Sequence, residues 1–161
     1  MNWNSLPESI RVRRARKEDQ RLILKLQSLT NRPRRQDNSF SDYFIAEING
    51  RAVGTAALRC RRNSAYLYGL TVLPQWRRRG IGHLLTAKRL DSAEARCMNC
   101  AYVMAMFWNI RFFKRHKFKV INKTLACELE WLHKDFEESW CSRSAVLSLA
   151  LKSKGTRHGL R

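Results

Sequence analysis

Acidic side chains are scarce in this sequence. Its 161 residues include 13 Asp and Glu against 32 Lys and Arg, which gives a formal net charge of +19 at pH 7. A charge so far from zero attracts anions. We therefore expect an anionic partner, and both a phosphorylated small molecule and RNA meet that description.

Long hydrophobic runs are also absent. The longest uninterrupted apolar run, residues 101–108, is far shorter than the roughly 20 residues that a membrane-spanning helix needs. The N-terminus lacks the basic-then-apolar pattern of a secretory leader. Apolar residues still make up 44% of the chain, which suffices for the two-layer core of one domain. We expect a soluble protein without a membrane partner.

The cysteines lack a repeated spacing. There are five, an odd number, which favours reduced thiols in a cytoplasmic protein over a disulfide framework. Cys97 and Cys100 form one C-x-x-C motif, but a zinc site needs two further ligands. No second C-x-x-C motif or paired histidine follows, so we expect no metal site.

Glycine is also infrequent, with seven residues, yet two of them stand one residue apart. Gly80 and Gly82 follow Arg77, Arg78 and Arg79 and open a segment of helix-forming composition. Glycines let backbone N–H groups turn inward without a Cβ in the way, and a helix start adds its positive end at the same place. Arginines add forked, permanently charged donors. This stretch predicts a cradle for a pyrophosphate.

Hydrophobic periodicity predicts alternating strands and helices. A period of two predicts a strand over residues 9–15, and helical spacing of leucines predicts a helix from residue 17 to 29. The continuous apolar run at 102–107 predicts a strand that is buried on both faces and parallel to a neighbouring strand. Further strands are predicted over 43–48, 52–58, 65–72 and 145–151, a tight hairpin turn at Asn49 and Gly50, helices over 81–97 and up to Phe118, a loop over 31–41 and an acid-rich segment over 124–139.

Residues 70–85, LTVLPQWRRRGIGHLL, resemble the acetyl-CoA loop of the GNAT acetyltransferase superfamily. The family pattern is Q/R-x-x-G-x-G/A, which Arg77, Gly80 and Gly82 fill without a gap. The order of predicted elements is similar to the GNAT fold over residues 9–151. The resemblance implies an α/β fold with a mixed, mostly antiparallel central sheet, helices on both faces and a splayed strand pair that forms the CoA cleft. We expect one such domain over residues 1–151, followed by a basic, disordered tail over 152–161.

The resemblance also implies where acetyl-CoA would bind as cosubstrate. The pantetheine arm would pair with the strand before the loop, and the pyrophosphate would lie over the backbone of the loop, with Arg77 or Arg79 holding a phosphate oxygen. Asn109 is carried over as a further CoA contact, although Lys117 replaces the glycine usual in that part of the family. The expected cofactor-binding residues are Leu70, Thr71, Val72, Arg77, Arg78, Arg79, Gly80, Ile81, Gly82, His83 and Asn109.

Candidate catalytic residues follow from the same resemblance. Family members often carry a carboxylate and a tyrosine where this sequence has Met104 and Phe113. Other members place the base on the strand before the loop, and at the matching positions this sequence has Tyr68 and Tyr66, which are therefore the candidate catalytic residues. Period-two alternation puts both tyrosines on the face of Leu70 and Val72, where either would relay the amine proton through water. The alternative is that both tyrosines only fill the cleft wall.

The implied function is an acetyl-CoA-dependent N-acetyltransferase that acts on a primary amine by direct attack. Glu128, Glu130 and Asp135 would draw a cationic acceptor, whereas the many arginines favour an anionic amino acid such as glutamate or a protein bound to nucleic acid. Two other functions stay open: a CoA-binding module with little catalysis, and a basic nucleic-acid-associated domain. The sequence leaves the acceptor open, and a homodimer as well.

Overall fold

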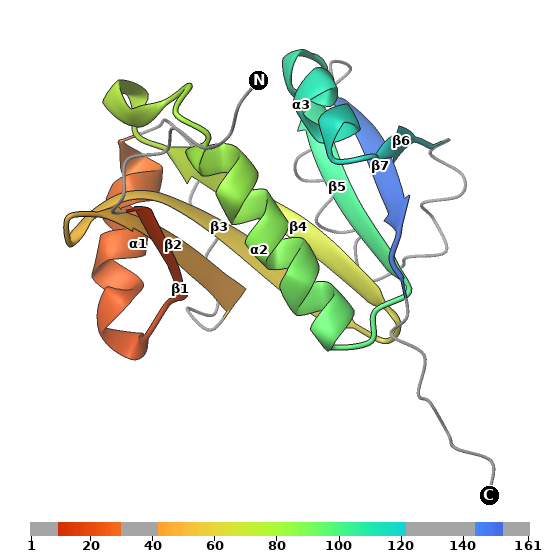
Figure 1. Cartoon of the computed structure of the whole chain (residues 1–161), viewed down its shortest axis with the longest axis horizontal. Coiled ribbons are helices and arrows are strands. Elements are labelled where there is room, and N and C mark those ends of the chain that lie inside the picture. Colours follow the sequence, from red (N-terminus) through yellow and green to blue (C-terminus); the bar gives the residue numbers. More distant parts are fainter. Residues whose placement is uncertain (1–9, 30–41, 122–143, 153–161) are drawn as a thin grey trace, which may run out of the picture. The chain divides into compact units, whose positions relative to one another are not determined.

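The computed structural model describes residues 10–29, 42–121 and 144–152 (Figure 1). The predicted loop at 31–41, the acid-rich segment at 124–139 and the tail beyond Lys152 lie outside these residues. The elements are β1 (Ile10–Arg14), a 3-10 turn (Lys17–Asp19), α1 (Gln20–Ser28), β2 (Tyr43–Ile48), β3 (Arg51–Arg61), β4 (Ser64–Val72), a 3-10 turn (Pro74–Trp76), α2 (Ile81–Ala95), β5 (Cys100–Met106), a 3-10 turn (Phe107–Asn109), α3 (Ile110–Arg115), β6 (Lys119–Val120) and β7 (Ser144–Ala150).

The strands form one sheet in the order β1-β2-β3-β4-β5-β7-β6. The chain divides into two compact units, Met1–Arg59 with Leu67–Ser92, and Cys60–Tyr66 with Ala93–Arg161. No described helix has the length and hydropathy that a bilayer crossing needs. The α/β class and the mostly antiparallel sheet predicted from the sequence are confirmed.

The first unit contains the predicted antiparallel hairpin. β2 pairs with β1 on one side, with Ile10 opposite Ile48, and with β3 on the other. Asn49 and Gly50 connect β2 to β3 with φ values of 50° and 75°. Two successive left-handed residues are what a two-residue hairpin turn requires, so this turn confirms the prediction.

Helices α1 and α2 cover opposite faces of the sheet in this unit. Gln27 of α1 donates a hydrogen bond of 2.8 Å to the Tyr43 hydroxyl. A Cβ on Gly54 would instead lie 3.4 Å from Leu85 of α2. Gly54 stands opposite Ala46 of β2, and Ala46 comes three residues after Tyr43 in the same strand. Because successive side chains of a strand alternate between its faces, Tyr43 and Ala46 point to different faces.

The second unit contains β5, which pairs antiparallel with β7 along its whole length. Ala101, Val103 and Ala105 are buried, while the residues between them are partly exposed. The strand prediction at 102–107 is therefore confirmed, but burial on both faces was wrong. Tyr102 and Met104 lie between the buried positions and are partly exposed, and because apolar residues are also common on protein surfaces, the apolar run did not reveal that only one face is buried. The two-residue strand β6, which pairs with β7, was not predicted.

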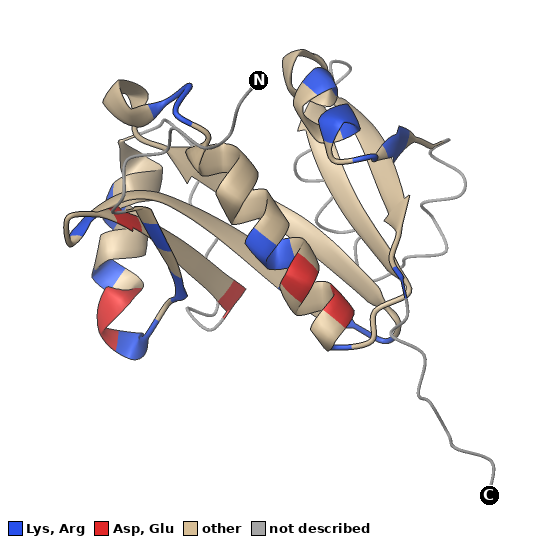
Figure 2. Cartoon of the chain, in the orientation of Figure 1, with Lys and Arg blue, Asp and Glu red and all other residues tan. Residues whose placement is uncertain are grey.

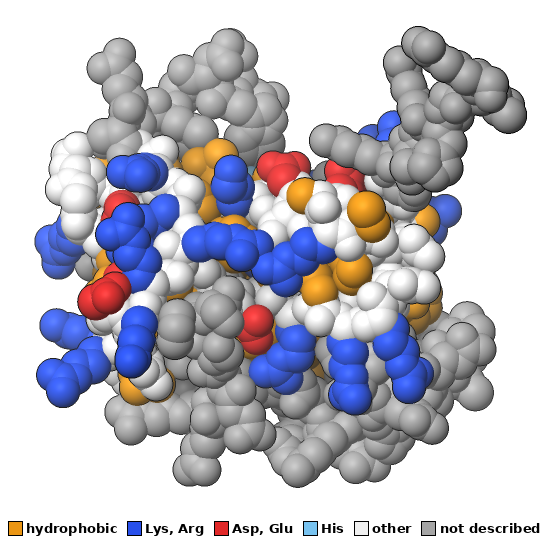
Figure 3. Space-filling model, turned by 90° about the horizontal axis from the view of Figure 1, so that it is seen from below, with side chains coloured by type: hydrophobic (Ala, Val, Ile, Leu, Met, Phe, Trp, Pro, Cys, Tyr) orange, Lys and Arg blue, Asp and Glu red, His pale blue; other side chains and the backbone are white. Residues whose placement is uncertain are grey.

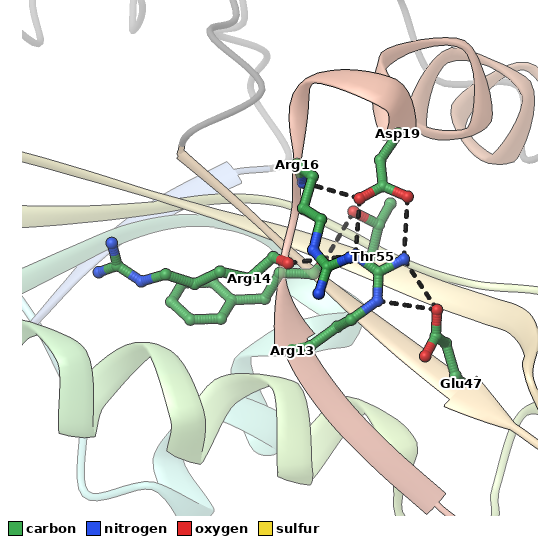
Figure 4. Close-up of polar contacts among 7 residues, drawn as sticks. Arg13, Arg14, Arg16, Asp19, Glu47 and Thr55 are labelled. Atoms are coloured by element: carbon green, nitrogen blue, oxygen red, sulfur yellow. Dashed lines mark hydrogen bonds and ion pairs between the residues drawn. The ribbon is translucent and has the colours of Figure 1, made fainter.

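An ion cluster joins β1, β2 and the residues that lead into α1 (Figure 4). Arg13 donates two hydrogen bonds to the two carboxylate oxygens of Asp19, at 2.6 and 2.9 Å, and its Nε donates to Glu47 at 2.9 Å. The N–H of Arg16 also donates to Asp19, at 2.7 Å. These bonds favour the ionised carboxylate and lower the pKa of Asp19 to about 2, chiefly through the hydrogen bonds from Arg13.

We predict that Asp19→Asn destabilises the protein at pH 7 by about 2 kcal/mol, because a carboxyl with a lowered pKa stabilises the fold while it is ionised. This contribution is complete above the ordinary carboxyl pKa near 4 and is lost as the pH falls toward 2. Urea unfolding at pH 7 and pH 3 measures this contribution. The difference in unfolding free energy between wild type and Asp19→Asn should be smaller at pH 3 than at pH 7. Glu18→Gln, at an exposed position of the same turn, is the control. A difference in unfolding free energy between wild type and Asp19→Asn that does not change with pH contradicts the prediction.

Candidate cofactor-binding site

Strand β4 contains a bulge at Gly69. Gly69 has a φ of +62°, and a Cβ there would lie 3.4 Å from the Tyr43 ring. The Tyr68 ring packs on the same Tyr43 ring, edge to face, with 6.0 Å between centroids. Two consecutive residues thus point to one face, which is the geometry of a β-bulge and needs the left-handed backbone that glycine adopts readily.

The bulge overturns part of the sequence analysis. A Cβ on Gly54, which points toward α2, would lie 3.3 Å from Cγ2 of Val72. Val72 therefore lies on the α2 face, whereas Tyr68 lies on the face of Tyr43 and α1. The prediction that Tyr68 shares a face with Val72 was wrong, because one extra residue at the bulge reverses the alternation beyond it.

Gly54 lets β3 approach the end of β4 closely. A Cβ at this position would stand 2.9 Å from the carbonyl oxygen of Thr71, closer than real Cβ atoms come to a backbone oxygen. Sequence analysis missed Gly54, although a glycine inside a strand often marks the close approach of another backbone. The position of Thr71 and Val72 therefore depends on a residue in the neighbouring strand.

Two buried polar groups near the predicted loop have no hydrogen-bond partner among the described residues. They are the hydroxyl of Thr71 and the indole N–H of Trp76. A buried polar group without a partner costs about 1–3 kcal/mol, so such groups are uncommon and often meet a ligand. Both stand where the sequence predicts CoA, one in the pantetheine strand and one beside the phosphate loop. The residues at the end of β4 and beside the loop therefore fit coenzyme A.

The loop between β4 and α2 carries the arginines of the motif, and residues 73–90 contain no acidic side chain (Figure 2). Arg77 bridges the loop, because its Nε donates a 3.0 Å hydrogen bond to the carbonyl oxygen of Val72. The Arg79 guanidinium lies over the Trp76 ring, 4.8 Å from its centroid. Arg77 and Arg79 are thus held by the loop itself, and both residues are exposed to solvent.

Helix α2 begins at the predicted glycines. Arg78 and Gly80 have φ values of +62° and +79°, which turn the chain into the helix, and Ile81 is buried. The first helical hydrogen bond runs from the N–H of Leu84 to the carbonyl of Gly80, at 3.1 Å. Ile81 and Gly82 stand in the first turn of the helix, where backbone N–H groups and the helix dipole favour an anion.

The structure places Leu70 to His83 together in the first unit, whereas Asn109 lies in the second. Asn109 ends a 3-10 turn and precedes α3. Phe113, at the position of the family's usual tyrosine, is buried and packs on Phe118 with 5.8 Å between ring centroids. Met104 is half-buried in β5.

The two candidate tyrosines are buried. Tyr66 belongs to the second unit and is 3% exposed. The Tyr68 hydroxyl donates a 3.1 Å hydrogen bond to Asp42 and accepts one of 3.4 Å from Arg59, which also forms an ion pair with Asp42. Burial raises the pKa of Tyr68, so its phenol stays protonated at neutral pH. Sequence analysis missed Asp42 because it follows the loop over 31–41, far from Tyr68 in the chain.

Comparisons with known proteins agree with this loop and fold. Residues 39–120, just over half of the chain, match the family described as "Acetyltransferase (GNAT) domain". The chain belongs to the GNAT acetyltransferase family. The resemblance stated from the sequence is thereby confirmed.

A curated relative, the uncharacterized N-acetyltransferase CT2212 of Chlorobaculum tepidum, is 31% identical over 91 residues, which are 56% of this chain and 57% of the relative. The N-acetylglutamate synthase of Neisseria gonorrhoeae, solved with coenzyme A and L-arginine, aligns with a TM-score of 0.73 and 23% identity over 90% of this chain and 34% of its own. Arabidopsis thaliana Naa50, solved with the bisubstrate analogue CoA-Ac-MVNAL, aligns with a TM-score of 0.71 and 21% identity over 89% and 99%. This chain thus spans only about half of the curated relative and a third of the synthase, and the structural likeness shows the fold.

We predict that Gly54→Ala weakens acetyl-CoA binding, because the new methyl group pushes the carbonyl of Thr71 away and shifts the end of β4. Overpacking of this kind costs about 1–3 kcal/mol of stability. Gly50→Ala is the matched control, since it strains a turn at φ +75° with no atom within 4 Å of the new Cβ. Calorimetric titration should show lower affinity for Gly54→Ala alone, and equal losses in both variants would contradict the role of Gly54.

Proposed function

We propose that this protein is an N-acetyltransferase that transfers the acetyl group of acetyl-CoA to a primary amine by direct attack. The observation that carries the proposal is the loop from Arg77 to Gly82 at the start of α2, together with the Thr71 hydroxyl and the Trp76 indole N–H, which find no hydrogen-bond partner in the described part of the chain. A nucleotide thioester combines a pyrophosphate with an amide-containing arm. The loop suits the pyrophosphate, and the end of β4 suits the arm.

The cosubstrate supplies an activated acetyl thioester, and the chain supplies the groups that hold it. Backbone N–H groups from Arg78 to His83 bind the pyrophosphate, and the terminal guanidinium nitrogens of Arg77 and Arg79 neutralise its charge. The backbone of Leu70, Thr71 and Val72 pairs with the pantetheine amides, and Asn109 adds a further contact. The N–H groups near Thr71 and Val72 stabilise the oxyanion of the tetrahedral intermediate.

The attacking amine must lose a proton, and we assign its removal to Tyr68. A neutral phenol relays a proton without ionising, since it accepts one through water while its own passes to the carboxylate of Asp42. Tyr66 is the alternative relay. The CoA thiolate leaves without a dedicated acid, because a thiol with a pKa near about 8.5 is a fair leaving group. This assignment agrees with Met104 and Phe113, which offer no proton.

Assays with a panel of amines will identify the class of acceptor. The neighbours include an N-acetylglutamate synthase and an enzyme solved with a peptide-like bisubstrate analogue, so the panel contains acidic amino acids, short peptides and polyamines. The excess of arginine favours the acidic amino acids. We place the enzyme in the cytoplasm, because Cys97 and Cys100 are free thiols. A homodimer belongs to the same proposal and is checked by light scattering.

A nucleic-acid-associated domain is the weaker candidate. Figure 3 shows one face, on which Lys and Arg side chains are interspersed with other side chains. A dedicated nucleic-acid surface concentrates its cations along one face or stripe. RNA serves as a competitor in the assays.

The test of the proposed function has two steps. Acetyl-CoA should raise the melting temperature, and the amine panel should then release free thiol. Binding without thiol release from any amine would make the protein a CoA-binding module, and no binding at millimolar acetyl-CoA would overturn the proposal.

We predict that Arg77→Gln together with Arg79→Gln raises the KM for acetyl-CoA by at least about 10-fold, because each charged hydrogen bond is worth about 1.5–3 kcal/mol. Arg61→Gln with Arg62→Gln removes the same charge from the exposed end of β3 and the turn after it, and should leave KM nearly unchanged. Steady-state kinetics at two salt concentrations distinguish the two pairs. An equal effect of both pairs would mean that net charge alone attracts the cosubstrate.

We predict that Tyr68→Phe lowers kcat by about 10²-fold, the lower range for a positioned proton-transfer group, and leaves acetyl-CoA affinity within about twofold. Asp42→Asn should lower kcat as well, because it removes the final proton acceptor. Raising the pH should partly restore both variants, since the amine then arrives deprotonated. Tyr66→Phe is the parallel variant, and unchanged turnover in Tyr68→Phe would transfer the relay to Tyr66 or to solvent.

A further inference from the structure

Arg89 in α2 is the largest fully buried side chain of the described residues, with an exposed fraction of 0%. Its guanidinium donates to the Leu85 carbonyl at 3.3 Å and to the Thr86 hydroxyl at 3.0 Å. One nitrogen, Nη1, donates to the carbonyls of both Ala57 and Tyr68, at 3.2 Å each. Burying a charge is costly, and these four hydrogen bonds are what makes this placement tolerable.

The two strand carbonyls that Arg89 binds lie at the bulge of β4. Tyr68 is the residue directly before Gly69, and a Cβ on Gly69 would stand 3.7 Å from Cβ of Ala57 in β3. A bulge interrupts the ladder between two strands and leaves nearby backbone groups without their regular partners. Arg89 supplies a donor to β3 and β4 at the place where their own hydrogen bonding is disturbed.

We propose that Arg89 is a positioning residue for acetyl-CoA, which it serves by holding the bulge at Gly69 and so the direction of Leu70, Thr71 and Val72. This inference rests on the proposed function. Arg89 belongs to the helix whose first turn meets the pyrophosphate, and it binds the strand that meets the pantetheine. It therefore sets the distance between the two halves of the cosubstrate site.

Only arginine satisfies this position. Its planar fork reaches acceptors on Ala57, Tyr68, Thr86 and Leu85 at once, in a rigid arrangement. A lysine ammonium is a single point charge on a flexible stem, so it would meet one or two of these acceptors. A methionine would fill the volume and bind none. These two replacements separate the charge from the bridging geometry.

The experiment compares Arg89→Met and Arg89→Lys with wild type. Arg89→Met keeps most of the side-chain volume but leaves the carbonyls of Ala57 and Tyr68 without this donor, so we expect it to fold with lowered stability. We expect the KM for acetyl-CoA to rise by at least about 10-fold, and hydrogen exchange at the amides of Leu70, Thr71 and Val72 to become faster than in wild type. Exchange in β2 should stay unchanged. Arg89→Lys should show an intermediate effect on both readouts.

Ile23→Val is the control for a general loss of stability. It removes one methylene from the core beneath α1, which costs about 0.5–1.5 kcal/mol without touching β4. It should lower the melting temperature and leave both KM and the exchange of Leu70 to Val72 unchanged. A purely structural Arg89 would give the same pattern as Ile23→Val.

Wild-type affinity and wild-type exchange in Arg89→Met would overturn the inference. If Arg89→Met does not fold, the exchange measurement on Arg89→Lys decides in its place. If wild type itself fails to bind acetyl-CoA, the proposed function fails and the positioning of a cosubstrate with it. Faster exchange confined to Leu70, Thr71 and Val72 would then still show that Arg89 holds the bulge, so the two failures are distinguishable.

Discussion

The left-handed backbone at Gly69 governs everything that follows it in β4. Before this residue, Tyr68 points to the face of Tyr43 and α1, and after it Val72 points to the face of α2. Without the bulge, the side chains of Thr71 and Val72 would exchange faces, and the buried Thr71 hydroxyl would no longer stand where it does. The orientation of the side chains at the end of β4 therefore depends on one glycine and not on a charged group.

A close approach and a buried cation keep this arrangement in place. Gly54 admits the carbonyl of Thr71 because it has no side chain, and Arg89 binds the carbonyls of Tyr68, just before the bulge, and of Ala57 in β3. The Arg13–Asp19 pair then ties the first strand to the start of α1, on another part of the same unit. These three contacts involve backbone or charged groups, whose geometry is more specific than that of apolar packing.

Sequence reasoning recovered the elements better than the contacts between them. The strand at 43–48 agrees with β2 residue for residue, and the loop at Arg77 to Gly82 opens α2 as expected. Both rest on local signals, namely alternation, paired left-handed residues and glycine spacing. Arg89 gave no such signal, because a lone arginine in a helix is usually exposed and its strand acceptors lie 21 and 32 residues away. The sequence analysis did not identify Asp42 for the same reason, since 26 residues separate it from Tyr68.

The amino-acid sequence by itself determined the order of the main strands and helices, the membership of the GNAT family and the place of the glycine-containing loop before α2, because these depend on spacings within about 20 residues. Only the tertiary structure decided which face each β4 side chain occupies, which polar groups lack a partner and which arginine is buried. Those properties arise when β3, β4 and α2 come together, where a single change of φ or one missing Cβ reorders contacts that no local pattern encodes.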